Sequence, residues 1–386
     1  MRFVSQARCG IALAVLTAAL AGPALAATDE EITAALVGAL EQSGASDVKF
    51  DGPTRDGDTL TYANMSFRQA KDPAAAAAGA SEVSVESLDL TGADIPTPGA
   101  FSADVVEARG MQLVDGETTL NVTAARTAGI LISAPQPDAA RTQRYDELSV
   151  DQLSAIRDGR EMIGMGRLSI ENDDFLDNYP RKFVMQIDDV VFDPSAAPNG
   201  AEAMAQLSSL GYEKLAFDFA LDGTWDDTEE TARIAPLKIT GTDIGTLELS
   251  LTLAGVSREV LDEMQKPEPS FDLLTGLAIS DLRLRFDDGS VTNRILSAQA
   301  AEMGTDAAGL AGQLAAALPL LLSPLQNPPF QTKVATAAGA FLQNPQSITV
   351  TAKPTEPVSF LEVIGASQAA PQTLPDLLNA DITANQ

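Results

Sequence analysis

The stretch IAPLKITGTDIGTLELSLTLAGV, residues 234–256, decides the fold that this sequence predicts. Between residues 247 and 253, leucine alternates with glutamate, serine and threonine. Successive side chains of a strand point to opposite faces of a sheet, so this period indicates a strand with one leucine face and one polar face. Residues 237–239 repeat the pattern, and residues 240–245 supply turn-forming Gly and Asp. The stretch therefore predicts an antiparallel hairpin with one apolar face.

Further segments of this kind follow one another with turns roughly ten residues apart, as in an antiparallel meander. They are residues 59–67, 83–90, 111–114, 118–123, 129–133, 166–170, 183–192, 212–225 and 277–286. Strict alternation in the first places Leu60, Tyr62, Asn64 and Ser66 opposite Thr61, Ala63, Met65 and Phe67. In residues 183–192 it places Phe183, Met185, Ile187 and Asp189 opposite Val184, Gln186, Asp188 and Val190.

Helical patterns stand at both ends of the chain and interrupt its middle. Thr28 and Glu31 have capping-box spacing, which predicts a short helix that stops near Gly44. Residues 145–158 have helical spacing, although Ser149 and Val150 could equally open a strand. A short helix is predicted in the middle, at 201–210, and the C-terminal third predicts helices at 291–303, from Asp306 onward, at 331–342 and at 359–366. The predicted fold class is α+β, a curled meander of antiparallel strands with a short N-terminal helix and a helix-rich C-terminal third.

The predicted organisation is a signal peptide, residues 1–26, followed by a β-rich region, residues 27–200, and a hairpin-plus-helix region, residues 201–386. The loop at 194–200 suggests the boundary, although one continuous sheet could cross it. An alanine-rich run at residues 74–80 predicts a loop or a short helix.

The N-terminus has the form of an export signal. Arg2 and Arg8 precede an apolar run at residues 11–20, and Ala24-Leu25-Ala26 is a small-residue cleavage site. Because Cys9 is the only cysteine, cleavage after Ala26 leaves a chain with none, and no transmembrane anchor is expected after cleavage. We expect a Gram-negative periplasmic location.

The formal net charge of −29 argues against nucleic-acid binding, which needs a basic footprint on phosphates. It also disfavours docking on anionic headgroups by charge alone. A basic protein partner or divalent cations remain compatible with it.

The sequence offers no catalytic constellation. It contains no histidine, so histidine-based acid–base catalysis, Ser–His or Cys–His nucleophiles and histidine zinc sites are excluded within this chain. Phosphate-binding and nucleophile-elbow motifs are also lacking. A carboxylate-based hydrolase stays open as an alternative, because its chemistry needs only Asp and Glu. The sequence predicts no catalytic residue, no metal ligand and no cofactor.

Acidic clusters and one tryptophan are the remaining candidates for binding. Residues 172–178, NDDFLDN, group hard oxygen ligands of the kind calcium prefers, and Asp226-Asp227 and Asp287-Asp288 are sparser examples. Solvated turns explain such residues better, because Asp and Asn favour turns. Trp225 could be a ligand platform, but a packing role at a strand end is the stronger interpretation.

The segment 314–322 is strongly apolar but too short to span a bilayer. A buried core helix, kinked or ended by Pro319, is the favoured interpretation, and membrane contact is the alternative.

The strands with a leucine face, followed by DDGSVTNRIL at 287–296, resemble exported bacterial β-repeat proteins of the AsmA-like and YdgA-like kind. The segment FLQNPQSITVTAKPTEPVSF, 341–360, is similar to conserved hypothetical exported proteins of alphaproteobacteria. The resemblance covers about the last 180 residues. It implies envelope maintenance and a lipid-lined groove in a curled sheet, and it carries no catalytic residues.

The expected function is therefore non-enzymatic: a periplasmic binding or envelope-maintenance protein whose leucine faces line a groove for lipid. The alternative is a structural module that binds an envelope protein and no small molecule. In that alternative, the apolar face is simply a core.

Overall fold

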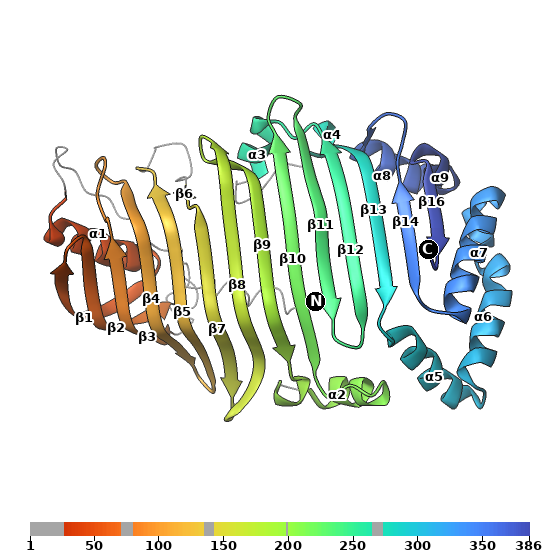
Figure 1. Cartoon of the computed structure of the whole chain (residues 1–386), viewed down its shortest axis with the longest axis horizontal. Helices are drawn as coiled ribbons and strands as arrows, with labels where there is room; N and C mark the ends of the chain where they lie inside the picture. Colours follow the sequence, from red (N-terminus) through yellow and green to blue (C-terminus); the bar gives the residue numbers. More distant parts are fainter. Residues whose placement is uncertain (1–26, 71–79, 135–142, 198–199, 265–272) are drawn as a thin grey trace. The chain divides into compact units, whose positions relative to one another are not determined.

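The structure, a computed structural model, describes residues 27–70, 80–134, 143–197, 200–264 and 273–386. These residues form sixteen strands, all antiparallel, with helices concentrated towards the C-terminus (Figure 1). The α+β class, the meander, the short N-terminal helix and the helix-rich C-terminal region are confirmed. The proposed signal peptide and most of the alanine-rich run lie outside the described residues.

The chain divides into two compact units, residues 1–179 and 180–386. The sequence placed the division near residue 200. The loop there joins strand β9 (Tyr179–Phe192) to strand β10 (Leu215–Asp226), which pair with each other within the second unit. A loop rich in Pro and Gly can therefore connect neighbouring strands of one sheet without separating domains.

In the first unit, helix α1 (Asp29–Gln42) precedes strands that pair in the order β1-β2-β3-β4-β5-β7-β8, with β6 on β5. The strands are β1 (Ala45–Asp56), β2 (Thr59–Ala70), β3 (Ala80–Thr91), β4 (Phe101–Asp115), β5 (Thr118–Ile132), β6 (Gln143–Arg144), β7 (Glu147–Arg157) and β8 (Arg160–Leu176). The helical expectation for residues 145–158 is wrong. Strand β7 instead lies between β5 and β8, because pairing on both sides outweighs weak local helical spacing.

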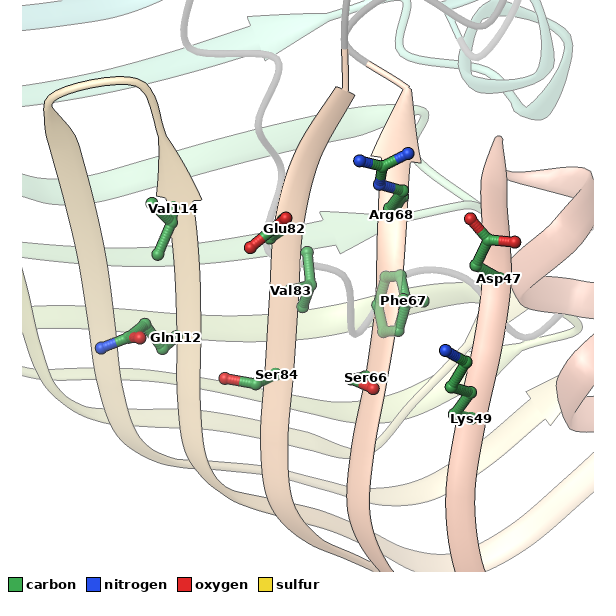
Figure 2. A pocket seen from close by; sticks show the side chains of 10 residues that line it. All are labelled: Asp47, Lys49, Ser66, Phe67, Arg68, Glu82, Val83, Ser84, Gln112 and Val114. Carbon is green, nitrogen blue, oxygen red and sulfur yellow. The ribbon is translucent and has the colours of Figure 1, made fainter.

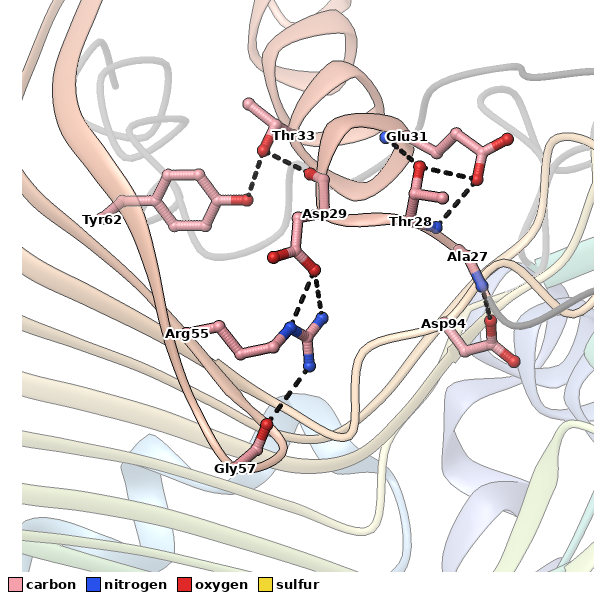
Figure 3. Close-up of polar contacts among 9 residues, drawn as sticks. All are labelled: Ala27, Thr28, Asp29, Glu31, Thr33, Arg55, Gly57, Tyr62 and Asp94. Carbon is pink, nitrogen blue, oxygen red and sulfur yellow. Dashed lines mark hydrogen bonds and ion pairs between the residues drawn. The ribbon is translucent and has the colours of Figure 1, made fainter.

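Helix α1 packs on the sheet of the first unit, and polar contacts tie its N-terminal part to β1 and β2 (Figure 3). Thr28 and Glu31 form the predicted capping box, and Arg55 of β1 binds the carboxylate of Asp29. The apolar residues of α1 join those of β2 to β5 in one buried cluster that contains Ile32, Leu36, Leu40, Leu60, Tyr62, Leu90 and Ile132. The Tyr62 hydroxyl, fully buried, is hydrogen-bonded to Thr33 at 2.9 Å.

A row of unpaired residues interrupts strict alternation across this sheet, and we call it the crease: Asn64, Glu86, Gly110, Thr123 and Gln152. In each of these strands the flanking residues pair while the crease residue is skipped. Asn64, Gly110 and Gln152 adopt left-handed φ angles of 50°, 60° and 50°. Each strand thereby changes the face to which its side chains point.

The crease corrects the predicted face assignment of β2. Leu60 and Tyr62 before it, and Met65 and Phe67 after it, are all buried on the same face. The buried residues of β2 are thus two, three and again two positions apart. Strict alternation had instead predicted that Asn64 and Ser66 share a face with Leu60.

In the second unit, strands pair in the order β9-β10-β11-β12-β13-β14-β16, with β15 on β13. The remaining strands are β11 (Thr231–Gly241), β12 (Gly245–Ala254), β13 (Ala278–Asp288), β14 (Ser347–Ala352), β15 (Val358–Ser359) and β16 (Ala380–Ala384). The predicted hairpin is confirmed: β11 and β12 pair from Thr231↔Ala254 to Gly241↔Gly245.

The α-helices of this unit are α2 (Gly200–Ser209), α3 (Arg258–Met264), α4 (Leu273–Gly276), α5 (Val291–Met303), α6 (Ala307–Leu321), α7 (Pro328–Gln343), α8 (Phe360–Ala369) and α9 (Leu374–Leu377). Short 3-10 turns are η2 (Pro194–Ala196), η3 (Ser323–Leu325) and η4 (Pro371–Thr373). Gly304 ends α5 in the left-handed conformation, and the side chain of Asp306 caps α6. The sequence predicted that the first helix ends at residue 303 and that the second starts near Asp306. Helix α7 contacts β16 and β14, and α6 packs against α7 (Figure 1).

The expectation of a buried core helix at residues 314–322 is wrong. Only 11% of the apolar stretch Ala307–Leu325 is buried, and Leu320 and Leu321 are 77% and 62% exposed. Pro319 lies inside α6 and the helix ends two residues after it. By length and composition alone this stretch could cross a membrane.

Candidate functional site

The main candidate site is an apolar sheet face of the second unit, which we call the leucine face. Residues paired directly across neighbouring strands share a face, so the pairings of β9 to β16 assemble rows. One row is Ile187, Phe219, Ile239, Leu247, Phe286 and Ile348. The next is Met185, Leu221, Leu237, Leu249, Leu284, Val350 and Ile382. A third contains Phe183, Ile234, Leu251, Leu282, Ala352 and Ala380.

These apolar side chains are incompletely covered. Leu284, in the middle row, is 37% exposed, and the other large side chains of the three rows are half-buried. By contrast, Leu36 of α1 and the residues Leu60 and Leu90 of the sheet face that α1 covers are at most 1% exposed. A face that a helix covered as a core would show exposures of that second kind, so the leucine face is an open surface.

Among the described residues, helix α7 covers part of this face from one edge. The ring of Phe341 on α7 packs edge-on against Phe286, with ring centroids 6.3 Å apart. Helix α7 otherwise lies along β16 and β14, at the end of the sheet. The apolar side chains of β10 to β12 therefore lie outside the part of the face that Phe341 covers.

The size of the leucine face follows from its strands. Each row crosses seven strands, β9 to β14 and β16. At a spacing of about 4.8 Å between strands, a row extends about 29 Å. One leaflet contributes about half of the ~30 Å hydrocarbon thickness of a bilayer, so a row is long enough for an extended acyl chain.

An irregularity in β9 adds one residue to this face. Asp189 has a left-handed φ of 56°, and the pairing shifts between Ile187↔Phe219 and Val190↔Phe217. Val190 therefore shares the leucine face, whereas alternation placed Asp189 beside Ile187 and Val190 opposite. The bulge removes a carboxylate from the face and puts an apolar side chain there.

One end of the leucine face carries polar groups. Arg181, two residues before Phe183 in β9, forms an ion pair with Asp227 at 2.5 Å, and its Nε is buried without a hydrogen-bond partner. Beside it, Trp225 is 7% exposed and its indole N–H donates to the Val256 carbonyl at 2.8 Å. Trp225 is thus a packing residue, as the stronger interpretation held. No sequence pattern singles out Arg181, because its place at the end of the leucine face depends on strand pairing.

The opposite face of the same strands is polar. Lys238 and Glu248 approach to 3.9 Å across β11 and β12, and Arg285 binds Asp287 within β13. Ser250 and Arg283 pair there directly behind Leu249 and Leu284. The sheet of the second unit is therefore amphipathic, with its charge on one side.

The acidic clusters have structural roles. Asp226 accepts hydrogen bonds from the backbone N–H groups of Thr228 and Glu229 in a turn, and Asp288 accepts from Thr292 at the start of α5. Residues 172–176 continue strand β8, so in that cluster the turn prediction fits only Asp177 and Asn178. Among the described residues, no three Asp or Glu side chains gather into a metal-binding group.

A second candidate is an open hollow of about 450 Å³ on the first unit (Figure 2). Its rim carries Asp47, Lys49, Arg68 and Glu82, while Ser66, Ser84 and Gln112 form the remaining polar wall. Charges of both signs alternate around it and no apolar floor is deep enough to enclose a ligand. The leucine face is the better candidate because it is larger and chemically uniform.

The shifted carboxyl groups do not suit acid catalysis. A hydrogen bond from the Ser195 hydroxyl lowers the pKa of Asp193, and one from Lys333 lowers the pKa of Asp381. Backbone hydrogen bonds lower the pKa values of Glu31 and Glu362 in their capping boxes. A carboxyl that donates a proton near neutral pH needs a raised pKa, and these shifts run the other way.

A family model described as "Uncharacterized protein" matches residues 238–385, which include β12 to β16 and helices α3 to α9. The match covers less than half of the chain and contains most of the leucine face. No curated protein and no solved structure matches this chain.

Proposed function

We propose that this protein is a non-enzymatic lipid-binding protein of the bacterial envelope, and that acyl chains lie along the leucine face. The observation that carries the proposal is the open state of three paired apolar rows in an otherwise acidic protein. Exposed apolar surface costs about 25 cal/mol per Å² relative to its burial. Contiguous apolar surface of this extent marks a binding site more often than plain surface.

The chemistry of the face favours acyl chains over polar ligands. The three rows contain no charged or hydrogen-bonding side chain, so the face offers area without directional contacts. A flexible hydrocarbon chain needs only such area, whereas a polar ligand would need several placed donors and acceptors. The resemblance to AsmA-like proteins, which implies a lipid-lined groove, points to the same ligand class.

Export to the periplasm is part of the proposal and rests on the sequence of residues 1–26. Cell fractionation followed by mass spectrometry of the intact protein tests it. We expect a periplasmic protein that begins at Ala27; an N-terminus at Met1 in the cytosolic fraction would contradict it.

Lipid retention tests the ligand. We would purify the full chain without detergent, extract it with organic solvent and identify lipids by mass spectrometry. The variant L249Q/L284Q changes a directly paired couple on the leucine face. The matched control S250Q/R283Q changes the adjacent couple on the opposite face of the same strands.

We expect phospholipid with the wild type and the control, and a loss of at least about tenfold in L249Q/L284Q, since each buried leucine contributes about 1.5–3 kcal/mol. Circular dichroism should show the same fold in all three proteins. A lipid-free extract from folded wild-type protein would instead favour the structural module that binds an envelope protein.

A further inference from the structure

The corner between α6 and α7 is an uncharged, exposed apolar surface separate from the leucine face. We call it the corner; it comprises Pro319, Leu320, Leu321, Ser323 and Pro324, all exposed. No charged residue occurs between Asp306 and Lys333, in a chain whose net charge is −29. Leu320 and Leu321 are 77% and 62% exposed, the two most exposed leucines among the described residues.

Two backbone carbonyls at the turn of the corner, those of Leu322 and Ser323, are hydrogen-bonded from within the protein. The Gln331 side chain on α7 donates to the Leu322 carbonyl at 2.9 Å and to the Ser323 carbonyl at 3.3 Å. The N–H groups of Leu325 and Gln326 donate back to the same two carbonyls. An unpaired carbonyl would oppose transfer into an apolar medium at a cost of several kcal/mol, and these bonds remove that obstacle.

Packing holds the corner in place while leaving it uncovered. Leu310 and Ala311 of α6 are buried against Leu296 and Ala300 of α5. At Gly339 of α7, an added Cβ would lie 3.7 Å from the Cβ of Ala315, which shows how closely α6 and α7 approach. The two leucines therefore project from a braced helical hairpin.

We propose that the corner docks this protein on the surface of a lipid bilayer by inserting Leu320 and Leu321 among the acyl chains near the headgroups. An apolar tip whose two turn carbonyls are hydrogen-bonded suits the membrane interface, because these polar groups do not have to leave water unpaired. Because the corner is uncharged and the protein is acidic, only the transfer of apolar side chains out of water drives the docking. It is independent of anionic lipid and insensitive to salt.

Flotation with phosphatidylcholine vesicles tests the proposal on the full chain. We expect the wild type to float with these neutral vesicles equally at low and high salt. L320S/L321S should reduce the vesicle-bound fraction at least about tenfold, because both leucines lose their transfer into the apolar layer. Mass spectrometry of each preparation verifies that all variants carry the same N-terminus, so residues 1–26 do not bias the comparison.

The matched control is L361S/I364S on α8, which makes the same kind of change at side chains 49% and 39% exposed beside the charged Glu362. It should float as the wild type does. L249Q/L284Q should also float while retaining little lipid, so that failure of the docking proposal and failure of the proposed lipid function are distinguishable.

A second measurement reports the corner directly. Ser323→Cys in a Cys9→Ser background, labelled with an environment-sensitive dye, should show a blue shift when the same vesicles are added. Failure of the wild type to float, flotation of L320S/L321S at the wild-type level, or binding that requires anionic lipid would each overturn the proposal. So would a wild-type dimer in lipid-free solution that L320S/L321S converts to monomer, since the corner would then bind a second copy of the chain.

Discussion

Single residues in the left-handed conformation determine which side chains reach the core of the first unit. At Asn64, Gly110 and Gln152 the chain takes one unpaired step, and the apolar residues on both sides of that step share a face. Side chains hold the row together: Asn64 donates to Asp51 at 2.9 Å, and Thr123 donates to Gln152 at 3.1 Å. The alternation of side chains between the two faces thus shifts by one residue at the crease, while the strands keep their pairing register on both sides of it.

The variant Gly110→Ala measures how much stability the protein loses when a side chain is placed at this position of the crease. A Cβ at Gly110 would lie 2.3 Å from the Glu86 Cδ, and its φ of 60° already disfavours an L side chain by about 1–2 kcal/mol. The control Gly116→Ala has the same φ of 60° with nothing within 4 Å of the added Cβ. We expect denaturant unfolding to show a loss of about 1–2 kcal/mol for Gly116→Ala and a larger loss for Gly110→Ala.

The further change E86A in the Gly110→Ala protein should recover the difference between the two variants. Equal losses at Gly110 and Gly116 would show that Glu86 moves aside without cost.

The capping box of α1 makes stability depend on pH. Hydrogen bonds from the Thr28 backbone and side chain lower the pKa of Glu31 below its ordinary 4.5. Because the folded-state pKa is the lower one, the stabilisation is complete above pH 4.5 and is lost as the pH falls through the folded-state value. Glutamine can occupy the same position in a capping box without titrating.

We therefore expect the Tm advantage of the wild type over Glu31→Gln, measured at neutral pH, to shrink below about pH 4.5. Glu30→Gln, in the same turn but outside the box, should show a smaller change. An equal change in both variants would assign the effect to the helix N-terminus as a whole.

At this scale the sequence predicted the capping box, the end of α5 at residue 303 and the start of α6 near Asp306, because each depends on residues within four positions. It did not predict the crease. A prediction from strict alternation makes no allowance for one unpaired residue in a strand. The buried residues Leu60, Tyr62, Met65 and Phe67 are two, three and two positions apart, and this spacing can be recognised only once the strand pairing is known.

At the scale of elements, the two units treat apolar strand faces in opposite ways. Helix α1 covers the face of β2 to β5 and buries Leu36 to 1% exposure. The leucine face of β9 to β14 has no equivalent helix across its middle among the described residues, and α7 meets it at Phe286. The same strand pattern therefore forms a core in one unit and a surface in the other.

Two leucine truncations quantify this contrast. Leu36→Ala should lower the free energy of unfolding by about 2–5 kcal/mol, as for buried leucines that leave a cavity. Leu249→Ala should cost under about 1 kcal/mol in lipid-free protein, since a half-buried side chain loses less area and leaves no closed cavity. Urea denaturation monitored by circular dichroism measures both. A cost at Leu249 equal to that at Leu36 would mean that the leucine face is covered in solution.

Elements with strong local signals were predicted well, and elements decided by neighbours were not. The hairpin of β11 and β12 and helix α5 follow from their own residues. Strand β7 is the counterexample, because Leu148, Leu153 and Ile156 have helical spacing while the segment pairs with β5 and β8 on its two sides. Helix α6 was predicted as an element but placed in the core, since composition alone does not reveal which neighbours cover a helix.

At the scale of the whole molecule, charge and apolar surface are segregated. The chain has a formal net charge of −29, while the three rows of the leucine face and the corner contain no charged side chain. This arrangement suits a protein that stays dispersed in water and still meets hydrocarbon.

Bound lipid should therefore stabilise the protein as a whole. A ligand that binds only the folded state at 100 times its Kd adds about 2.7 kcal/mol to the free energy of unfolding. We expect phospholipid added to lipid-free wild-type protein to raise Tm in a concentration-dependent way, and to leave L249Q/L284Q nearly unchanged. Differential scanning fluorimetry measures Tm of each protein with phospholipid and in the same detergent-free buffer without it. Equal Tm shifts in the two proteins would mean that the lipid binds elsewhere.

The sequence predicted the amphipathic strands from which the candidate site is built, including Leu237, Leu249 and Leu284. It left open whether their apolar face is core or groove, because cover depends on helices that pack from elsewhere in the chain. Val350 and Ile382, which extend the middle row, come from strands about a hundred residues after the hairpin and join it only through β13 and β14.

Strand order in each unit follows chain order almost without exception. A protein of this kind can gain or lose a hairpin by a single insertion or deletion in its gene, because no other connection has to be rerouted. Each added hairpin would widen an apolar row by two strands, about 10 Å. Evolution could therefore fit the span of such a surface to the length of its cargo by changing the number of hairpins, and leave the chemistry of every strand as it is.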